Sequence, residues 1–129
     1  MNNLYREEIL EHYRSPQNFG FIENFSIKSK QTNPFCGDEI EIFINWKSTN
    51  KYKKKQISVG EISFNGYGCA ISIASASILT EYSKGKAINE LTKFSQKDML
   101  RLLGVEVSEA RKKCALLALG VLRDCLYAT

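Results

Sequence analysis

Residues 33–38, with the sequence NPFCGD, place a thiol and a carboxylate two positions apart. Gly37 between them allows the backbone to turn, so the side chains of Cys36 and Asp38 can point at one cation. Pro34 restricts the backbone that leads into this turn. Asn, Pro, Gly and Asp are also the common residues of ordinary turns, so the stretch alone is better explained by a plain turn than by a cation site.

A second thiol is expected at the start of a helix. Cys69 follows the glycine-containing stretch 65–68 and precedes a segment with helical spacing of its apolar residues. The unpaired N–H groups and the dipole at a helix N-terminus favour an anion, so this thiol should ionise more easily than a free cysteine.

The other two cysteines fall on one face of the last predicted helix. Cys114, Ala118, Val121 and Cys125 follow one another at steps of four, three and four residues, which places all of them toward the core. At a rise of about 1.5 Å per residue, Cys125 lies roughly 16 Å along the axis from Cys114, too far to share a small metal site. We interpret Cys125 as a small buried hydrophobe.

The candidate ligands of one metal site are therefore Cys36, Asp38, Cys69 and Cys114. Cys69 follows Cys36 by 33 residues and Cys114 follows Cys69 by 45, so the fold has to bring them together, unlike the ligands of a zinc-finger knuckle. Asp38 offers a hard oxygen among soft sulfurs and should exchange more readily than a thiolate. An exchangeable ligand suits a site that receives a group or hands one on.

Two basic residues precede Cys114 and are expected to support it electrostatically. Arg111 lies about one helical turn before Cys114, and Lys113 is adjacent in sequence. Both are protonated donors without a free lone pair, so neither is expected as a ligand. A divalent cation balances only half of the charge of four ionised ligands, and these two residues can offset the rest. His12, the only histidine, is interpreted as a packing or capping residue.

The periodicity of the chain predicts the elements that position these residues. Alternation of apolar and polar residues predicts strands over 25–31, 39–46 and 57–64, and the lysine-rich stretch 48–55 is predicted as a connection. Helical spacing and capping residues predict helices over 3–14, 70–82, 88–91, from Ser95 to Gly104 and from Ser108 to about Tyr127. The expected fold is α+β, a small three-stranded antiparallel sheet packed against four to five helices.

Composition limits the class of protein. A chain of 129 residues that is 43% hydrophobic fits one domain over residues 1–129, and its 25% of charged residues is typical of soluble globular proteins. No apolar run approaches the roughly 20 residues of a membrane span, and an N-terminus with Glu7, Glu8 and Glu11 is unlike a signal peptide. We therefore expect a cytoplasmic protein without a membrane partner.

The number of cysteines and the net charge indicate which kinds of chemistry and partner to expect in the cytoplasm. In the cytosol four cysteines are better explained by metal binding or thiol chemistry than by disulfides. The formal charge of +4 is modest, and the lysines of residues 47–55 are interpreted as a solvated tip. No nucleic-acid partner is expected.

Over nearly its whole length the chain resembles the U-type iron–sulfur cluster assembly family, which comprises IscU, SufU and the N-terminal domain of NifU. The resemblance rests on four motifs in the same order: residues 5–13 with Pro16, Asn18 and Gly20; residues 33–38; residues 66–72 with Ala74 and Ser75; and residues 111–115. It implies a SufE/NifU-like α+β fold with one site built from Cys36, Asp38, Cys69 and Cys114. It also implies a PLP-dependent cysteine desulfurase as partner, and apo iron–sulfur proteins or downstream assembly factors as recipients.

Two features relate the chain to different branches of this family. IscU-type proteins have a histidine directly before the third cysteine, whereas this chain has Lys113 and an Arg111-x-Lys113-Cys114 motif that resembles SufU. SufU proteins usually carry an insertion of about twenty residues between the second and third cysteines, and surface insertions of this kind are tolerated readily. The interval of 45 residues here resembles IscU. A lysine cannot replace a histidine ligand, so the chain is placed nearest to SufU.

The resemblance implies a zinc-dependent, sulfurtransferase-like acceptor that takes persulfide sulfur from the desulfurase. One alternative is a non-enzymatic scaffold on which a [2Fe–2S] cluster forms on Cys36, Cys69 and Cys114 before transfer, and another is a purely structural zinc domain. Cys36 is the expected sulfur acceptor, because a turn between strands is the most accessible placement. Cys114 is its rival, because the third cysteine more often has this role in IscU-like scaffolds.

Overall fold

The computed structural model describes residues 3–34, 37–51 and 54–128. Five helices and three strands follow one another in this part of the chain. They are α1 (Asn3–Arg14), β1 (Ile27–Asn33), β2 (Asp38–Lys51), β3 (Lys54–Tyr67), α2 (Ala70–Ser83), α3 (Ile88–Thr92), α4 (Gln96–Leu103) and α5 (Glu109–Tyr127).

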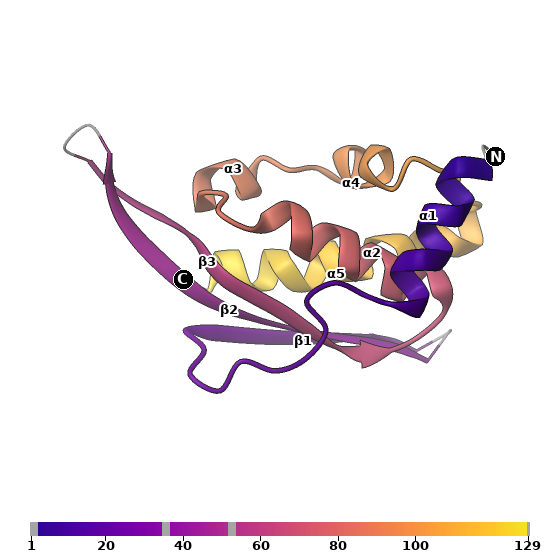
Figure 1. The fold of residues 1–129 in the computed structure, drawn as a ribbon, viewed down its shortest axis with the longest axis horizontal. Coiled ribbons are helices and arrows are strands. Elements are labelled where there is room, and N and C mark those ends of the chain that lie inside the picture. Colours follow the sequence, from indigo (N-terminus) through magenta and orange to yellow (C-terminus); the bar gives the residue numbers. More distant parts are fainter. Residues whose placement is uncertain (1–2, 35–36, 52–53, 129) are drawn as a thin grey trace.

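The three strands form one antiparallel sheet in the order β1-β2-β3, which confirms the predicted α+β class (Figure 1). Alternation along β2 buries Ile40, Ile42 and Ile44 completely, on the face that the helices cover. Ile42 pairs with Phe64 and Ile44 with Ile62 of β3, so apolar side chains of neighbouring strands meet on this face.

The hairpin between β2 and β3 is longer than the sequence pattern predicts. Ser48 pairs with Ile57 and Asn50 with Lys55, so the prediction of a connection over 48–55 is wrong for most of that stretch. Polar side chains indicate exposure to solvent, whereas backbone pairing satisfies the N–H and C=O groups whatever the side chains are. The hairpin projects beyond the helices at one end of the molecule (Figure 1).

The other end of β3 also continues further than predicted. The strand passes through Gly66, which pairs with Ile40, and reaches Tyr67 opposite Glu39. Gly66 has a φ of +144°, and a Cβ at this position would collide with the carbonyl group of Glu39. Glycine therefore lets the strand continue to the point where α2 begins.

Helices α2 and α5 lie side by side on one face of the sheet (Figure 1). α5 contacts β1 and β2, α2 contacts β3, and the largest completely buried helical side chains include Leu79, Met99, Leu119 and Leu122. Burying this apolar face supplies most of the stability that a three-stranded sheet lacks by itself.

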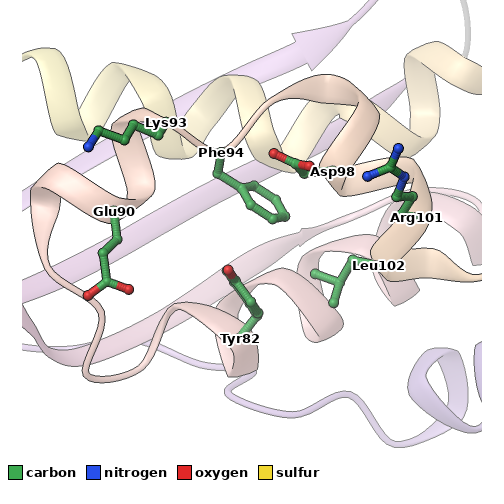
Figure 2. A pocket seen from close by; sticks show the side chains of 7 residues that line it. All are labelled: Tyr82, Glu90, Lys93, Phe94, Asp98, Arg101 and Leu102. Atoms are coloured by element: carbon green, nitrogen blue, oxygen red, sulfur yellow. The ribbon is translucent and has the colours of Figure 1, made fainter.

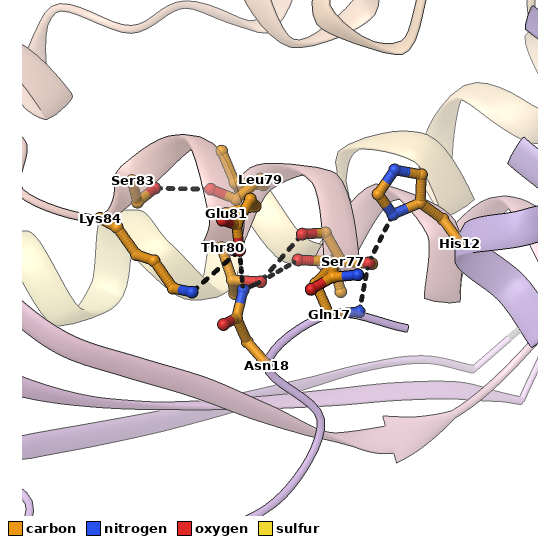
Figure 3. Close-up of polar contacts among 10 residues, drawn as sticks. His12, Gln17, Asn18, Ser77, Leu79, Thr80, Glu81, Ser83 and Lys84 are labelled. Atoms are coloured by element: carbon orange, nitrogen blue, oxygen red, sulfur yellow. Dashed lines mark hydrogen bonds and ion pairs between the residues drawn. The ribbon is translucent and has the colours of Figure 1, made fainter. Parts of the chain in front are cut away.

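Hydrogen bonds connect α1 and the residues that follow it to α2. Nδ1 of His12 and Oγ of Ser77 lie 2.7 Å apart and share a hydrogen bond, and the backbone N–H of Gln17 donates to the same oxygen at 2.8 Å (Figure 3). Asn18 donates to Thr80 and to Glu81 one turn further along α2. His12 therefore has the packing role predicted for it.

The helix ends follow the predicted caps with one difference. Ser95 and Asp98 form the predicted capping box of α4, and Gly104 ends that helix in the left-handed conformation. Ser108 is the N-cap residue of α5, but its side chain makes no capping hydrogen bond. In the described ranges, no helix combines the length and the apolar character that crossing a bilayer requires.

Candidate metal centre

Three of the four predicted ligands come from different elements and meet in space. Asp38 is the first residue of β2, Cys69 is the N-cap residue of α2, and Cys114 lies in the second turn of α5. Their ligand atoms all lie within 4.8 Å of one another. Cys36, the fourth predicted ligand, lies outside the described residues.

Local turns bring the first two of these residues together. Gly37 has a φ of +72°, and its N–H donates to the carbonyl of Asn33 at 2.8 Å immediately before Asp38 begins β2. The pairing of Glu39 with Tyr67 then places Gly68 beside Asp38. A Cβ on Gly68 would lie only 2.7 Å from Asp38 Oδ1, so the approach of the carboxylate requires glycine at this position.

The carboxylate of Asp38 caps helix α2 from another element. Asp38 is only 2% exposed, and its Oδ1 accepts a hydrogen bond from the backbone N–H of Cys69 at 3.1 Å. Its Oδ2 accepts a hydrogen bond from the hydroxyl of Ser72 at 2.6 Å. An anion is thus held at the positive end of the helix, where the side chain of Cys69 makes no cap of its own.

The thiol of Cys69 is more acidic than an ordinary cysteine. Burial by itself raises the pKa of Cys69, but its contacts with the hydroxyl and the backbone N–H of Ser72 and with the thiol of Cys114 lower the pKa by more, against the opposing charge of Asp38. The pKa is therefore lowered overall, in the direction that its place at a helix N-terminus predicts.

The two cysteines of α5 have different surroundings. Cys114 is 1% exposed and lines the cavity of the cluster, whereas Cys125 is completely buried with its thiol 4.0 Å from the carbonyl of Ile42. Burial, together with the charge of Asp124, raises the pKa of Cys125 to about 12. Cys125 is therefore a neutral core residue, as expected, and lies apart from the ligand cluster.

The cluster opens into a cavity of about 510 Å³. Its lining residues are Gly37, Asp38, Tyr67, Gly68, Cys69, Ala110, Arg111 and Cys114. Arg111 thus lies in the wall of this cavity, and its electrostatic support of the site stays a prediction. Lys113 lines a neighbouring hollow together with Gln31, Pro34 and Leu117, so its predicted support of the site stays a prediction.

A larger cavity of about 590 Å³ lies between the end of α2, α3 and α4 (Figure 2). Tyr82 and Phe94, two of its lining residues, stack on each other at 4.9 Å between ring centroids, and its charged residues are Glu90, Lys93, Asp98 and Arg101. None of its lining residues is a cysteine or histidine. We therefore assign the metal chemistry to the smaller cavity.

The described ligands fit a thiophilic metal. Two thiols and one carboxylate, all at least partly buried, offer the sulfur and oxygen atoms that Zn²⁺ accepts in tetrahedral sites. Thiolates are also the ligands of iron–sulfur clusters. The three described ligands therefore fit both a zinc ion and an iron–sulfur cluster.

Ser72 is the residue of this site that the sequence pattern did not reveal. Its side chain is 1% exposed and contacts both Asp38 and Cys69. In the sequence Ser72 appeared only as the last residue of the family motif over 66–72. Its position three residues after the N-cap was the available signal, since side chains there commonly take part in capping.

Comparisons with known proteins identify the family of the chain. The family model described as the NifU-like N terminal domain matches residues 4–128. The zinc-dependent sulfurtransferase SufU of Bacillus subtilis is 35% identical over 92% of this chain and 86% of its own length. The iron–sulfur cluster assembly scaffold protein IscU 1 of Archaeoglobus fulgidus is 32% identical over 95% of this chain and 74% of its own length.

Solved structures show the same fold. FiSufU from Fervidobacterium islandicum AW-1, a candidate cluster assembly scaffold for the SUF system, superposes with a TM-score of 0.76 at 26% identity, over 93% of this chain and 94% of its own. The N-terminal part of a NifU-like protein from Brucella abortus superposes with a TM-score of 0.72 at 18% identity, over 97% and 93% of the two chains. The chain belongs to the family of NifU-like N-terminal domains.

Proposed function

We propose that this protein serves iron–sulfur cluster assembly as a zinc-dependent acceptor of sulfur from a cysteine desulfurase. The observation that carries the proposal is the cluster of Asp38, Cys69 and Cys114, whose ligand atoms lie within 4.8 Å of one another. Family membership and a relative named as a zinc-dependent sulfurtransferase support it. We place the protein in the cytoplasm, where its cysteines stay reduced.

The residues that would hold Zn²⁺ are Cys36, Asp38, Cys69 and Cys114. When bound, Zn²⁺ would keep the thiol ligands ionised at neutral pH and protect them from oxidation. Asp38 is the ligand most suited to exchange, because an oxygen ligand is held less tightly than a thiolate among soft ligands.

The sulfur-transfer step is an exchange between a thiolate and a persulfide. The acceptor thiolate attacks the terminal sulfur of the desulfurase persulfide, and a new S–S bond forms while the S–S bond in the desulfurase breaks. The desulfurase cysteine leaves as a thiolate, so the step needs no external oxidant or reductant. Arg111, in the wall of the cavity, can stabilise the attacking anion.

We propose Cys36 as the acceptor. Its rival Cys114 is only 1% exposed, so a persulfide on another protein could not reach it without rearrangement of this end of the molecule. Cys69 is also less suited, because it starts a helix and its N–H group holds Asp38.

The second candidate function is a scaffold on which a [2Fe–2S] cluster is assembled on Cys36, Cys69 and Cys114 and passed to apo-proteins. The interval of 45 residues between Cys69 and Cys114 and the scaffold relatives named IscU favour it. In this second function the [2Fe–2S] cluster is transferred to another protein, and Asp38 is the weakly held ligand that allows its release.

The two functions can be separated with the purified protein. Metal analysis and the visible absorption spectrum of freshly prepared protein distinguish bound zinc, which is colourless, from an iron–sulfur cluster. Cys→Ser variants at 36, 69 and 114 are then incubated with desulfurase and cysteine, and alanine release and the mass of one added sulfur atom are measured. Cys125→Ser is the matched control.

We expect zinc in the wild type, stimulated alanine release, and loss of both stimulation and labelling in Cys36→Ser. Full activity in Cys36→Ser together with loss in Cys114→Ser would favour the scaffold function. If the wild-type protein does not stimulate alanine release by the desulfurase, the proposed role as sulfur acceptor is wrong.

A further inference from the structure

One hydroxyl group lies between two of the proposed ligands. Oγ of Ser72 is 2.6 Å from Asp38 Oδ2 and 3.4 Å from Cys69 Sγ, while Sγ and Oδ2 are 4.0 Å apart. Ser72 is 1% exposed, so bulk water does not compete for these contacts. It lies in the first turn of α2, three residues after the N-cap Cys69.

A serine hydroxyl has a single proton, so it can donate to only one of these two groups at a time. The distance of 2.6 Å is typical of a short hydrogen bond from a hydroxyl to a carboxylate, so the proton is directed at Asp38 in this structure. A rotation about the Cβ–Oγ bond would direct the same proton at Cys69 Sγ.

The second oxygen of Asp38 is held by the same end of α2. Oδ1 accepts the N–H of Cys69 at 3.1 Å, and Gly68 packs directly against it. Each carboxylate oxygen has two lone pairs, so Asp38 can accept both hydrogen bonds and still bind a cation. Its departure from the metal, however, would break the bond from Ser72.

We infer that Ser72 is a positioning residue that controls how readily Asp38 exchanges at the metal. Its hydroxyl holds Asp38 in the ligand position and donates to the thiolate of Cys69 when Asp38 moves away. The inference rests on the proposed function, since it concerns ligand exchange at the proposed metal centre.

The first test is the rate of metal release to a coloured chelator from zinc-loaded protein. Ser72→Ala leaves a buried carboxylate oxygen without its donor, and such a loss corresponds to roughly a 5- to 30-fold change in an equilibrium. We expect release to become faster by a factor in that range, and Ser72→Thr, which keeps the hydroxyl, to restore the slow rate.

Ser75→Ala is the matched control for this measurement. It removes a completely buried hydroxyl from the same helix, one turn further on, where Oγ has no hydrogen-bond partner among the described residues. We expect release at the wild-type rate. Equal rates in wild type and Ser72→Ala would overturn the inference.

The second test uses the sulfur-to-metal charge-transfer band of the cobalt-substituted protein. With Asp38 present the Ser72 hydroxyl donates to the carboxylate and not to Cys69, so Ser72→Ala should change this band little. In an Asp38→Ala background the hydroxyl is available to Cys69, so adding Ser72→Ala should shift the band. Absence of a shift there would overturn the inference.

Comparing Asp38→Ala with the double variant Asp38→Ala/Ser72→Ala also tests the inference if Ser72→Ala alone does not fold. In these two proteins no buried carboxylate is left without a hydrogen-bond donor. The proposed function is judged separately. Wild-type protein that binds neither zinc nor cobalt would contradict the proposed metal centre, whereas normal binding with no effect of Ser72 would contradict only the inference.

Discussion

At the scale of single residues, Asp38 combines two roles that are usually separate. Its carboxylate accepts the hydrogen bonds that start α2, and the same oxygens lie within reach of the thiols of Cys69 and Cys114. A residue that caps a helix is held in place by the backbone, so Asp38 is oriented toward the thiols before any cation binds.

The capping role predicts a loss of stability in the metal-free protein. Asp38→Ala removes both acceptors at the N-terminus of α2, and loss of such a cap costs about 1 kcal/mol of unfolding free energy. Urea denaturation of the apo-protein measures this cost. In the metal-loaded state the variant should still bind through its thiols but exchange the metal at a different rate. An apo-protein as stable as the wild type would contradict the capping role.

The surroundings of the cysteines predict different reactivity toward an alkylating agent in metal-free protein. Cys69, with its lowered pKa, should be modified at mildly alkaline pH, whereas Cys125, with a pKa of about 12, should be modified only after unfolding. Peptide mapping by mass spectrometry measures both. Rapid labelling of Cys125 in the folded protein would show that its burial is incomplete.

Cys125 also predicts how stability depends on pH. Below its ordinary pKa of 9.0 the thiol is protonated in both the folded and the unfolded states, so it has no effect on stability. Between 9.0 and about 12 only the unfolded state loses the proton, so rising pH favours unfolding. Cys125→Ala should reduce the alkaline loss of stability, as measured by urea denaturation across that range. An identical pH dependence in the two proteins would contradict this.

At the scale of elements, short sequence signals place the ends of helices and the turns that build the site. The capping box of α4 and the left-handed Gly104 depend on residues within a few positions of each other. Gly68, between β3 and α2, differs, because its importance comes from contact with Asp38 of β2, far away in the sequence.

The capping box predicts a pH-dependent contribution from α4. The backbone N–H and then the hydroxyl of Ser95 lower the pKa of Asp98, so its stabilising effect is present above its ordinary pKa of 3.8 and is lost as the pH falls through the lowered value. Wild type should exceed Asp98→Asn in unfolding free energy at neutral pH and approach it in acid. Ser95→Ala should cost about 1 kcal/mol at neutral pH. A constant difference between wild type and Asp98→Asn at every pH would contradict this assignment.

The close approach at Gly68 predicts a specific loss of metal binding. In Gly68→Ala the new Cβ would lie 2.7 Å from Asp38 Oδ1, so the carboxylate has to shift from its place in the cluster. We expect weaker zinc binding with a native circular dichroism spectrum, measured by chelator competition. Gly120→Ala is the control, because its Cβ would meet only the flexible end of Gln31 at 2.9 Å. Equal losses in both variants would mean that the effect is not local to the site.

At the scale of the whole molecule, the site joins the parts that give the protein its shape. Asp38 belongs to the sheet, Cys69 to the start of α2 and Cys114 to α5, the two helices that cover the sheet. A metal bound there would link these three elements, and binding to the folded state alone adds to the free energy of unfolding.

Removal of the metal should therefore lower the melting temperature by several degrees. The measurement is differential scanning calorimetry before and after chelation, with metal content verified each time. Cys125→Ser should keep its metal and show the same decrease, whereas Cys69→Ser should melt at one temperature under both conditions. An unchanged wild-type curve after verified removal would show that the metal does not stabilise the fold.

The sequence by itself determined the types of the elements, several of their caps, the inward face of α5 and the burial of Cys125. These features depend on periodicity and on residues close together in the chain, so they can be recognised without a tertiary structure. The candidate ligands also came from the sequence, partly from residue chemistry and partly from family resemblance.

Only the tertiary structure decided that the β2–β3 hairpin stays paired to Lys51, that Lys113 lines a separate hollow, and that Ser72 lies between Asp38 and Cys69. The physical reason is common to all three. Strand register and the placement of helices on the sheet decide which side chains from distant parts of the chain meet, and no pattern within one segment records that choice.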